Sequence, residues 1–155
     1  MAPSLIVYLL RPSELTSPNT RILNPNCHSF AFASVPEIKS RGLSFPKGNI
    51  YLTIGRRKFG AVHIYDKHRR EMLQRGFDEF KQVNQFVASI IKPYAPLHFE
   101  GGDRANRLAV VQSSSGTAII QLRNSEDESY YNVVTAYLGR NRHGGRVGSL
   151  RPPIQ

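Results

Sequence analysis

The fold of this chain is decided by residues 97–138, which read LHFEGGDRANRLAVVQSSSGTAIIQLRNSEDESYYNVVTAYL. Four runs rich in β-branched and aromatic residues lie within it, at 97–100, 108–112, 117–123 and 130–138. Clusters of Gly, Ser, Asn and Asp separate these runs, as is typical of hairpin connections. The stretch therefore predicts consecutive antiparallel strands that form a meander.

Two segments before this meander have helical periodicity. In residues 59–74 a narrow apolar stripe runs among many charges, and Gly76 is a natural stop. In residues 77–91 apolar side chains recur at intervals of three and four, and Pro93 ends the pattern. A half-buried strand is expected at 49–54, where apolar and polar side chains alternate. The order of one strand, two helices and then a sheet indicates an α+β fold.

A length of 155 residues fits one domain with additional segments at its ends. Residues 1–45 contain five prolines among Ser, Thr and Asn, so we expect a lead-in arm or linker there. The domain itself is expected at 46–140, and a basic flexible tail at 141–155. The apolar run at 5–10 is too short for a membrane span and lacks the features of a signal peptide, although it could form an edge strand.

The composition is strongly basic, with 21 Lys and Arg against 11 Asp and Glu and a net charge of +10. Such a field concentrates polyanions, so nucleic acid is the first partner to consider, followed by an anionic membrane and an acidic protein. The single cysteine, Cys27, excludes an internal disulfide and a thiolate zinc site. No phosphate-binding glycine loop and no local Ser or Cys nucleophile motif is present, which excludes protein kinases, P-loop enzymes and serine hydrolases.

Two histidines and a lysine in the first predicted helix are candidates for proton transfer. On an ideal helix His63 and Lys67 share a face, whereas His68 lies about 140° round from His63. Either His63 and Lys67 face a site that His68 flanks, or the first turn is irregular and both imidazoles converge. Histidine exchanges protons near neutral pH. The spacing lacks the adjacent Glu of a zinc-binding helix, so we expect neither metal nor cofactor.

Hydroxyl and guanidinium groups gather around the last predicted strand. Thr135 and Tyr137 are two positions apart and point to one face, so both hydroxyls could reach one phosphate. Arg123 ends the preceding strand and Arg140 and Arg142 follow the last one, which suits charge spread over a pentacoordinate phosphorus. Packing within the sheet would explain Thr135 and Tyr137 equally well. Simple solvation would explain the arginines.

Several short motifs together resemble a known family. They are Asn-Ile-Tyr-Leu-Thr at 49–53, Gly60 followed by His63 and Lys67-His68, Ile-Ile-Lys-Pro at 90–93, and Val-Val-Thr-Ala-Tyr at 133–137. The pattern resembles the barnase, EndoU, colicin and RelE (BECR) superfamily of ribonucleases, particularly its toxin and phage-associated branches, over about residues 48 to 140. The resemblance implies N-terminal helices packed on a four- or five-stranded antiparallel sheet whose concave face cleaves RNA without metal.

The resemblance also implies roles and partners. His63 and His68 would be the acid and base, and Lys67, Thr135, Tyr137 and Arg140 would contact phosphate. The substrate would be RNA, often tRNA, and an acidic immunity protein would hold an otherwise monomeric toxin in check. Such a toxin is secreted or delivered, as in contact-dependent growth inhibition, and acts in the cytoplasm of the target cell.

Three alternatives fit the same residues. A bacterial ribonuclease A-like toxin would combine a helix His, a basic residue and a terminal Thr and Tyr strand on a different fold with the same chemistry. A basic RNA-binding or ribosome-associated module would use the positive charge for binding alone. A phage structural protein could bear an inactive copy of the domain.

Overall fold

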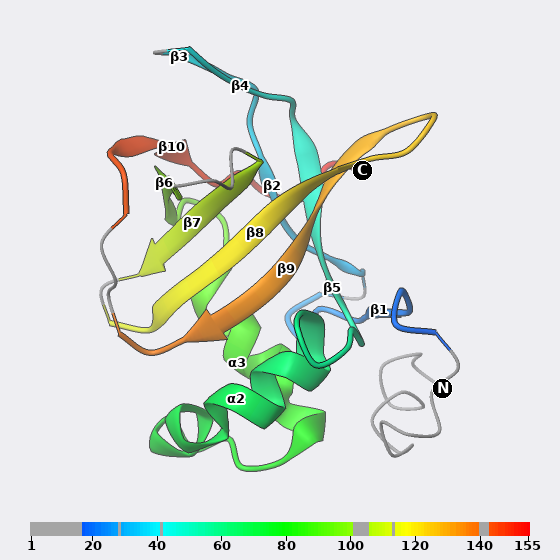
Figure 1. Ribbon diagram of the computed structural model, residues 1–155, viewed down its shortest axis with the longest axis vertical. Coiled ribbons are helices and arrows are strands. Elements are labelled where there is room, and N and C mark those ends of the chain that lie inside the picture. Colours follow the sequence, from blue (N-terminus) through cyan, green and yellow to red (C-terminus); the bar gives the residue numbers. More distant parts are fainter. Residues whose placement is uncertain (1–16, 28, 41, 101–105, 113, 140–142) are drawn as a thin grey trace.

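The computed structural model describes residues 17–27, 29–40, 42–100, 106–112, 114–139 and 143–155 (Figure 1). The possible edge strand at 5–10 lies outside these ranges. The strands are β1 (Arg21–Ile22), β2 (Ala31–Val35), β3 (Ile38–Ser40), β4 (Leu43–Phe45), β5 (Gly48–Thr53), β6 (Pro96–Phe99), β7 (Arg107–Gln112), β8 (Gly116–Asn124), β9 (Ser129–Tyr137) and β10 (Arg146–Ser149). The helices are α2 (Gly60–Gln74), the 3₁₀ turn η2 (Phe80–Gln82) and α3 (Val83–Ile90).

Eight strands form one mixed sheet in the order β1-β5-β9-β8-β7-β6-β10, with β2 also paired to β5. The predicted meander is present, because β6, β7, β8 and β9 pair consecutively and antiparallel. β5 and β9, in contrast, pair in parallel, and β3 and β4 form a separate hairpin. The predicted architecture of N-terminal helices on a four- or five-stranded antiparallel sheet is therefore wrong.

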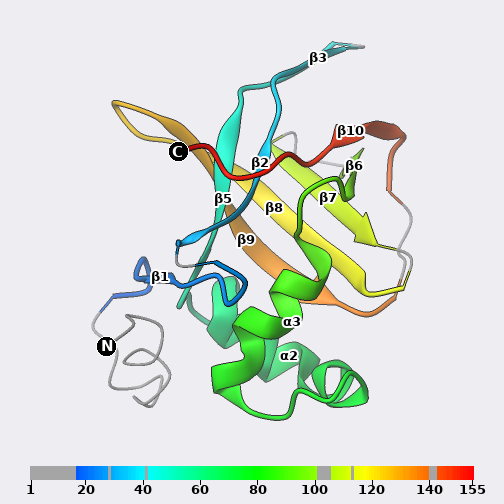
Figure 2. The same ribbon diagram turned by 180° about the vertical axis from the view of Figure 1, so that it is seen from behind.

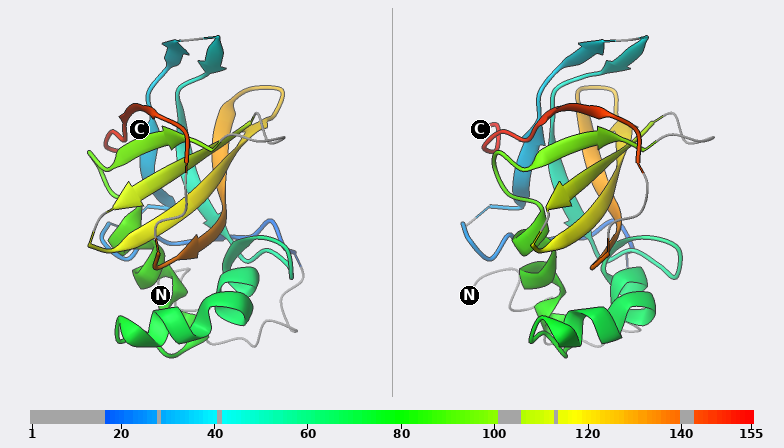
Figure 3. Two further views of the ribbon diagram at one scale, coloured as in Figure 1. Left: turned by 60° about the vertical axis from the view of Figure 1, so that its left-hand side comes forward. Right: turned by 90° about the vertical axis from the view of Figure 1, so that its left-hand side faces the viewer.

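The extra strands come from segments that the sequence predicts to lie outside the domain. Residues 17–45 supply β1 to β4, and Pro25 and Pro36 stand between these short strands, where a missing N–H costs nothing. The helices follow β5 in the chain, as the sequence predicts, but β1 and β2 of the sheet also precede them. They lie together at one end of it, as Figure 3 shows.

The C-terminal residues join two edges of the sheet; we call residues 146–154 the closing segment. Its first part, β10, pairs with β6, and Arg151 then exchanges two backbone hydrogen bonds of 2.8 Å with Ser34 in β2. The Ser34 hydroxyl donates to the carbonyl of Pro152 at 2.7 Å. Asn49 in β5 bonds Ile154 through both groups of its amide, at 2.7 and 2.9 Å. Figure 2 shows this red segment crossing from β10 towards β2.

The sheet has two faces of different character. Its inner face forms the main core with α3 and with the buried side of α2, including Phe86, Val87, Ile64 and Met72. Inside this core the Tyr131 hydroxyl donates to the carbonyl of Pro46 at 2.7 Å, and burial raises the pKa of Tyr131 far above its ordinary value. The opposite face, which we call the outer face, looks towards the viewer in Figure 1.

A smaller apolar cluster covers part of the outer face. Ala109, Ile119 and Val134 are its buried members, and Phe59, Val111 and Tyr137 pack against them. In the part of the chain that the structure describes, no helix combines the length and the apolar character that crossing a membrane requires.

Candidate functional site

The loop before α2 is held tight by two glycines with left-handed backbone. Gly55 has φ +76° and Gly60 has φ +80°, and a Cβ on Gly60 would lie 2.7 Å from the Cα of Gly55. Between them Arg56 and Phe59 form a short bridge, with the Arg56 N–H donating to the Phe59 carbonyl at 2.9 Å. The loop thereby fixes where α2 begins and where its first histidine lies.

The helix α2 is interrupted at His68, whose φ of −119° and ψ of 22° are not helical. The rings of His63 and His68 meet edge to face, with centroids 5.9 Å apart and an angle of 75° between their planes. The two imidazoles thus converge, although the irregularity that permits it lies at His68 and not in the first turn. Lys67 is exposed on the same helix.

Glu71 holds His68 in place from three residues further along α2. One oxygen of its carboxylate is hydrogen-bonded to Nδ1 of His68. The other oxygen accepts the backbone N–H of Leu138, just after β9, at 2.9 Å. On its other side the His68 ring lies against Tyr137, with centroids 5.6 Å apart. A single carboxylate therefore orients the imidazole and links α2 to the end of β9.

The hydrogen bonds of the two histidines define which ring nitrogens are available. Nδ1 of His63 lies 2.8 Å from the carbonyl oxygen of Arg57. A carbonyl only accepts, and an ionised carboxylate only accepts, so Nδ1 carries the proton in both rings. In both histidines Nε2 is then the atom that can take up or release a proton.

Thr135 and Tyr137 lie on the outer face with this pair. Cross-strand register places Thr135 beside Ile119 and Tyr137 beside Thr117, on the same side as the apolar cluster. The Thr135 hydroxyl oxygen is buried and has no hydrogen-bond partner within the described residues. Such a buried hydroxyl is costly unless a ligand or water completes it.

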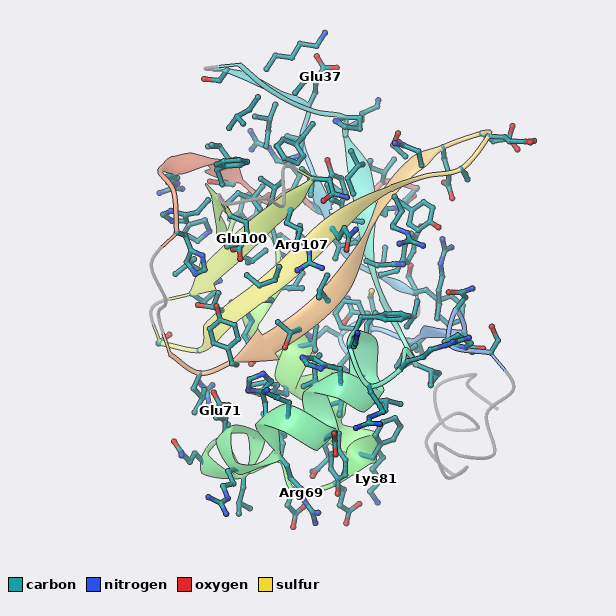
Figure 4. All side chains as sticks on the ribbon, viewed as in Figure 1. Glu37, Arg69, Glu71, Lys81, Glu100 and Arg107 are labelled. Carbon is teal, nitrogen blue, oxygen red and sulfur yellow. The ribbon has the colours of Figure 1, made fainter. Side chains whose placement is uncertain are left out.

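A pocket of about 220 Å³ lies further along the outer face. Its lining combines three cations, three amides and three apolar side chains: Lys58, Arg107, Arg123, Asn19, Gln121, Asn132, Phe59, Val133 and Val134. Arg123, predicted from the sequence, is exposed at this pocket. Arg140 and Arg142, predicted with it, lie outside the described residues. Figure 4 shows Arg107 over the middle of the outer face and Glu71 where α2 passes the end of β9.

Several of these residues were missed by sequence reasoning. A carboxylate three positions after a helical histidine is a usable signal, and it would have identified Glu71. Arg107, Gln121 and Asn132 form one row across β7, β8 and β9, which only the strand register reveals.

The geometry supports proton transfer beside a cationic, polar surface. Two imidazoles with oriented rings can serve as acid and base, and nearby hydroxyl and guanidinium groups can bind a phosphate. Among the described residues no three His, Cys, Asp or Glu side chains are grouped so as to hold a metal ion.

No protein-family model matches this sequence, and the search of curated proteins gives no significant match.

Proposed function

We propose that this protein is an endoribonuclease that cleaves RNA by transesterification without a metal ion. One of the imidazoles of His63 and His68 takes the proton of a ribose 2′-OH, and the 2′-oxygen bonds to phosphorus. The bond from phosphorus to the 5′-oxygen breaks, and the other, protonated imidazole gives that oxygen a proton. The products are a 2′,3′-cyclic phosphate and a 5′-hydroxyl end.

The observation that carries this proposal is the meeting of the two rings, 5.9 Å between centroids, with Nδ1 of each already engaged. An isolated surface histidine has neither a second imidazole nor a carboxylate that orients it. Here the Glu71 carboxylate is hydrogen-bonded to Nδ1 of His68 and orients the ring, as carboxylates do behind catalytic histidines.

Charge stabilisation would come from groups on either side of the pair. Lys67 is exposed on the same helix, and the Thr135 hydroxyl is buried and lacks a partner among the described side chains. Tyr137 lies against His68. We assign these three groups to the phosphate oxygens, where charge increases in the transition state.

The motifs that resemble the BECR ribonucleases include His63, His68, Thr135 and Tyr137. On that resemblance we propose tRNA as the substrate and an acidic immunity protein as the inhibitor of a delivered toxin. The net charge of +10 suits both an RNA and an acidic inhibitor.

The competing function is a basic module that binds RNA without cutting it, which the cationic pocket also favours. Total tRNA incubated in EDTA with the purified protein separates the two. We expect new cyclic phosphate ends, and a loss of at least about a hundredfold in rate for His63→Ala or His68→Ala.

His98→Ala is the matched control, because His98 lies in β6, three strands from β9 in the sheet, and contacts the carbonyl of Gly144 at 3.1 Å. This variant should cleave at nearly the normal rate. Intact tRNA after long incubation with folded wild-type protein would refute the nuclease and leave the binding module.

A further inference from the structure

The pocket on the outer face has the composition of a site for one nucleobase and its phosphates. At about 220 Å³ it is smaller than the roughly 300–1,000 Å³ of pockets for drug-sized ligands, so it suits a single ring system. Phe59 offers an aromatic surface, and Lys58 and Arg123 offer positive charge at the exposed rim. Proteins that bind single-stranded nucleic acid combine the same two features.

Asn132 is the polar group to which a base could bind. Its amide oxygen is buried and has no hydrogen-bond partner among the residues that the structure describes. A buried acceptor without a donor is unfavourable, so the site is incomplete as it stands. The N–H groups on the edge of a base are suitable donors, and an Asn amide can bond a base edge through two hydrogen bonds.

Neighbouring side chains hold the rest of the pocket in place. Gln121 lies opposite Asn132 in the strand register, and its side-chain oxygen accepts a hydrogen bond from Arg107 at 3.4 Å. Arg107 is thereby held beside the Gln121 and Asn132 amides, which would bind the base. The guanidinium group provides the geometry that phosphate oxygens prefer.

The pocket and the histidine pair both adjoin the small apolar cluster of the outer face. Phe59 lines the pocket, Tyr137 lies against His68, and both pack on the apolar cluster of Ala109, Ile119 and Val134. Along β9 Asn132 precedes Thr135 by three residues, roughly 10 Å at the usual rise of a strand. That separation suits a base in the pocket and the cleaved phosphate of a neighbouring nucleotide at the histidines.

From this arrangement we infer that the pocket binds one unpaired, unstacked nucleobase of single-stranded RNA, with Asn132 on the base edge and Lys58 and Arg123 on the flanking phosphates. The inference rests on the proposed function for its choice of RNA. A duplex is a poor ligand for this site, because pairing occupies the base edge that Asn132 would bind.

The test uses hexamers of fully 2′-O-methylated RNA, which have no 2′-OH and are not cleaved. In each hexamer one position is made abasic in turn, which leaves the phosphate charge unchanged. Affinity is measured by fluorescence anisotropy. We expect one position where loss of the base weakens binding about tenfold, a size typical of base stacking and hydrogen bonding.

In Asn132→Leu this difference should fall below about twofold, whereas in the control Asn26→Leu, at an exposed turn, it should persist. Asn132→Asp is the second variant, because it keeps the size of the side chain but not the amide donor. Thermal unfolding verifies that each variant is folded. Equal affinity for every abasic hexamer would overturn the inference, as would a tenfold effect that both Asn132 variants retain.

The same measurements distinguish this inference from the proposed function. Glu126→Gln, at an exposed turn outside the pocket and the histidine pair, should bind all hexamers as the wild type does. A position-specific effect in a protein that never cuts unmodified RNA would support the pocket and refute the nuclease.

Discussion

At the scale of single residues, Glu71 has the most unusual position in the site. Both oxygens of its carboxylate are used, one by His68 and one by the backbone N–H of Leu138. The first contact orients an imidazole, and the second holds α2 against the end of β9. The two contacts can be separated by mutation, because an amide can keep the second while changing the first.

Glu71→Gln should lower kcat for RNA cleavage by about tenfold to a thousandfold with little change in KM. The amide oxygen of Gln can still accept from Leu138, but the carboxylate that orients the His68 ring is lost. Glu126→Gln, at an exposed turn, is the control. A normal kcat in Glu71→Gln would show that Glu71 has no role in proton transfer.

Gly60→Ala should destabilise the protein by at least about 2 kcal/mol. The new Cβ would meet the Cα of Gly55 at 2.7 Å and the carbonyl oxygen of Thr53 at 2.9 Å, and the left-handed φ adds strain. Gly76→Ala is a close control, because Gly76 has φ +85° but its Cβ would meet nothing within 4 Å. For Gly76→Ala, urea unfolding should show a loss of only about 1 kcal/mol in the free energy of unfolding. Equal losses for the two variants would mean that the Gly55–Gly60 contact contributes nothing.

At the scale of elements, the long and periodic segments could be predicted from the sequence. Apolar alternation and turn residues identified β5 to β9, and intervals of three and four identified α2 and α3. The strands β1, β2 and β10 were not predicted. They are only two to five residues long, and their pairing partners are distant in the chain.

Part of the candidate site could likewise be predicted from the sequence, and part could not. His63, His68, Thr135 and Tyr137 could be named because their residue types and spacing suggest chemistry. The break at His68 that lets the rings meet, and the row of Arg107, Gln121 and Asn132, depend on tertiary packing and strand register. Local sequence patterns reveal neither the break in the helix nor this row of side chains.

Removing residues 151–155 should destabilise the protein by about 3 kcal/mol. The truncation deletes five hydrogen bonds to Ser34 and Asn49, each with a net value of about 0.5–1.5 kcal/mol, partly offset by the entropy of the released chain. The urea midpoint measures the loss. Deleting only the exposed Gln155 should leave the midpoint unchanged. A truncated protein as stable as the full chain would show that the contacts of residues 151–154 with Ser34 and Asn49 are dispensable.

At the scale of the whole molecule, the net charge of +10 makes RNA binding depend on ionic strength. The logarithm of the affinity for uncleavable single-stranded RNA should fall linearly with the logarithm of the salt concentration, by about 0.7 for each phosphate contacted. Lys58→Gln should reduce that slope by about 0.7, because Lys58 lines the pocket. Lys92→Gln removes an equal charge after α3 and should leave the slope unchanged. If Lys58→Gln and Lys92→Gln had the same salt dependence, the RNA would bind outside this pocket.

The closing segment also has a consequence for how the molecule assembles. Ser34 and Pro152 are 118 positions apart, so we expect their pairing to form late in folding. Until then β2 presents unsatisfied amide and carbonyl groups to solvent, and such an edge can recruit another copy of itself. Renaturation from urea should therefore give less monomer as protein concentration rises, with light scattering reporting the aggregates. Refolding at low protein concentration should therefore reduce this aggregation.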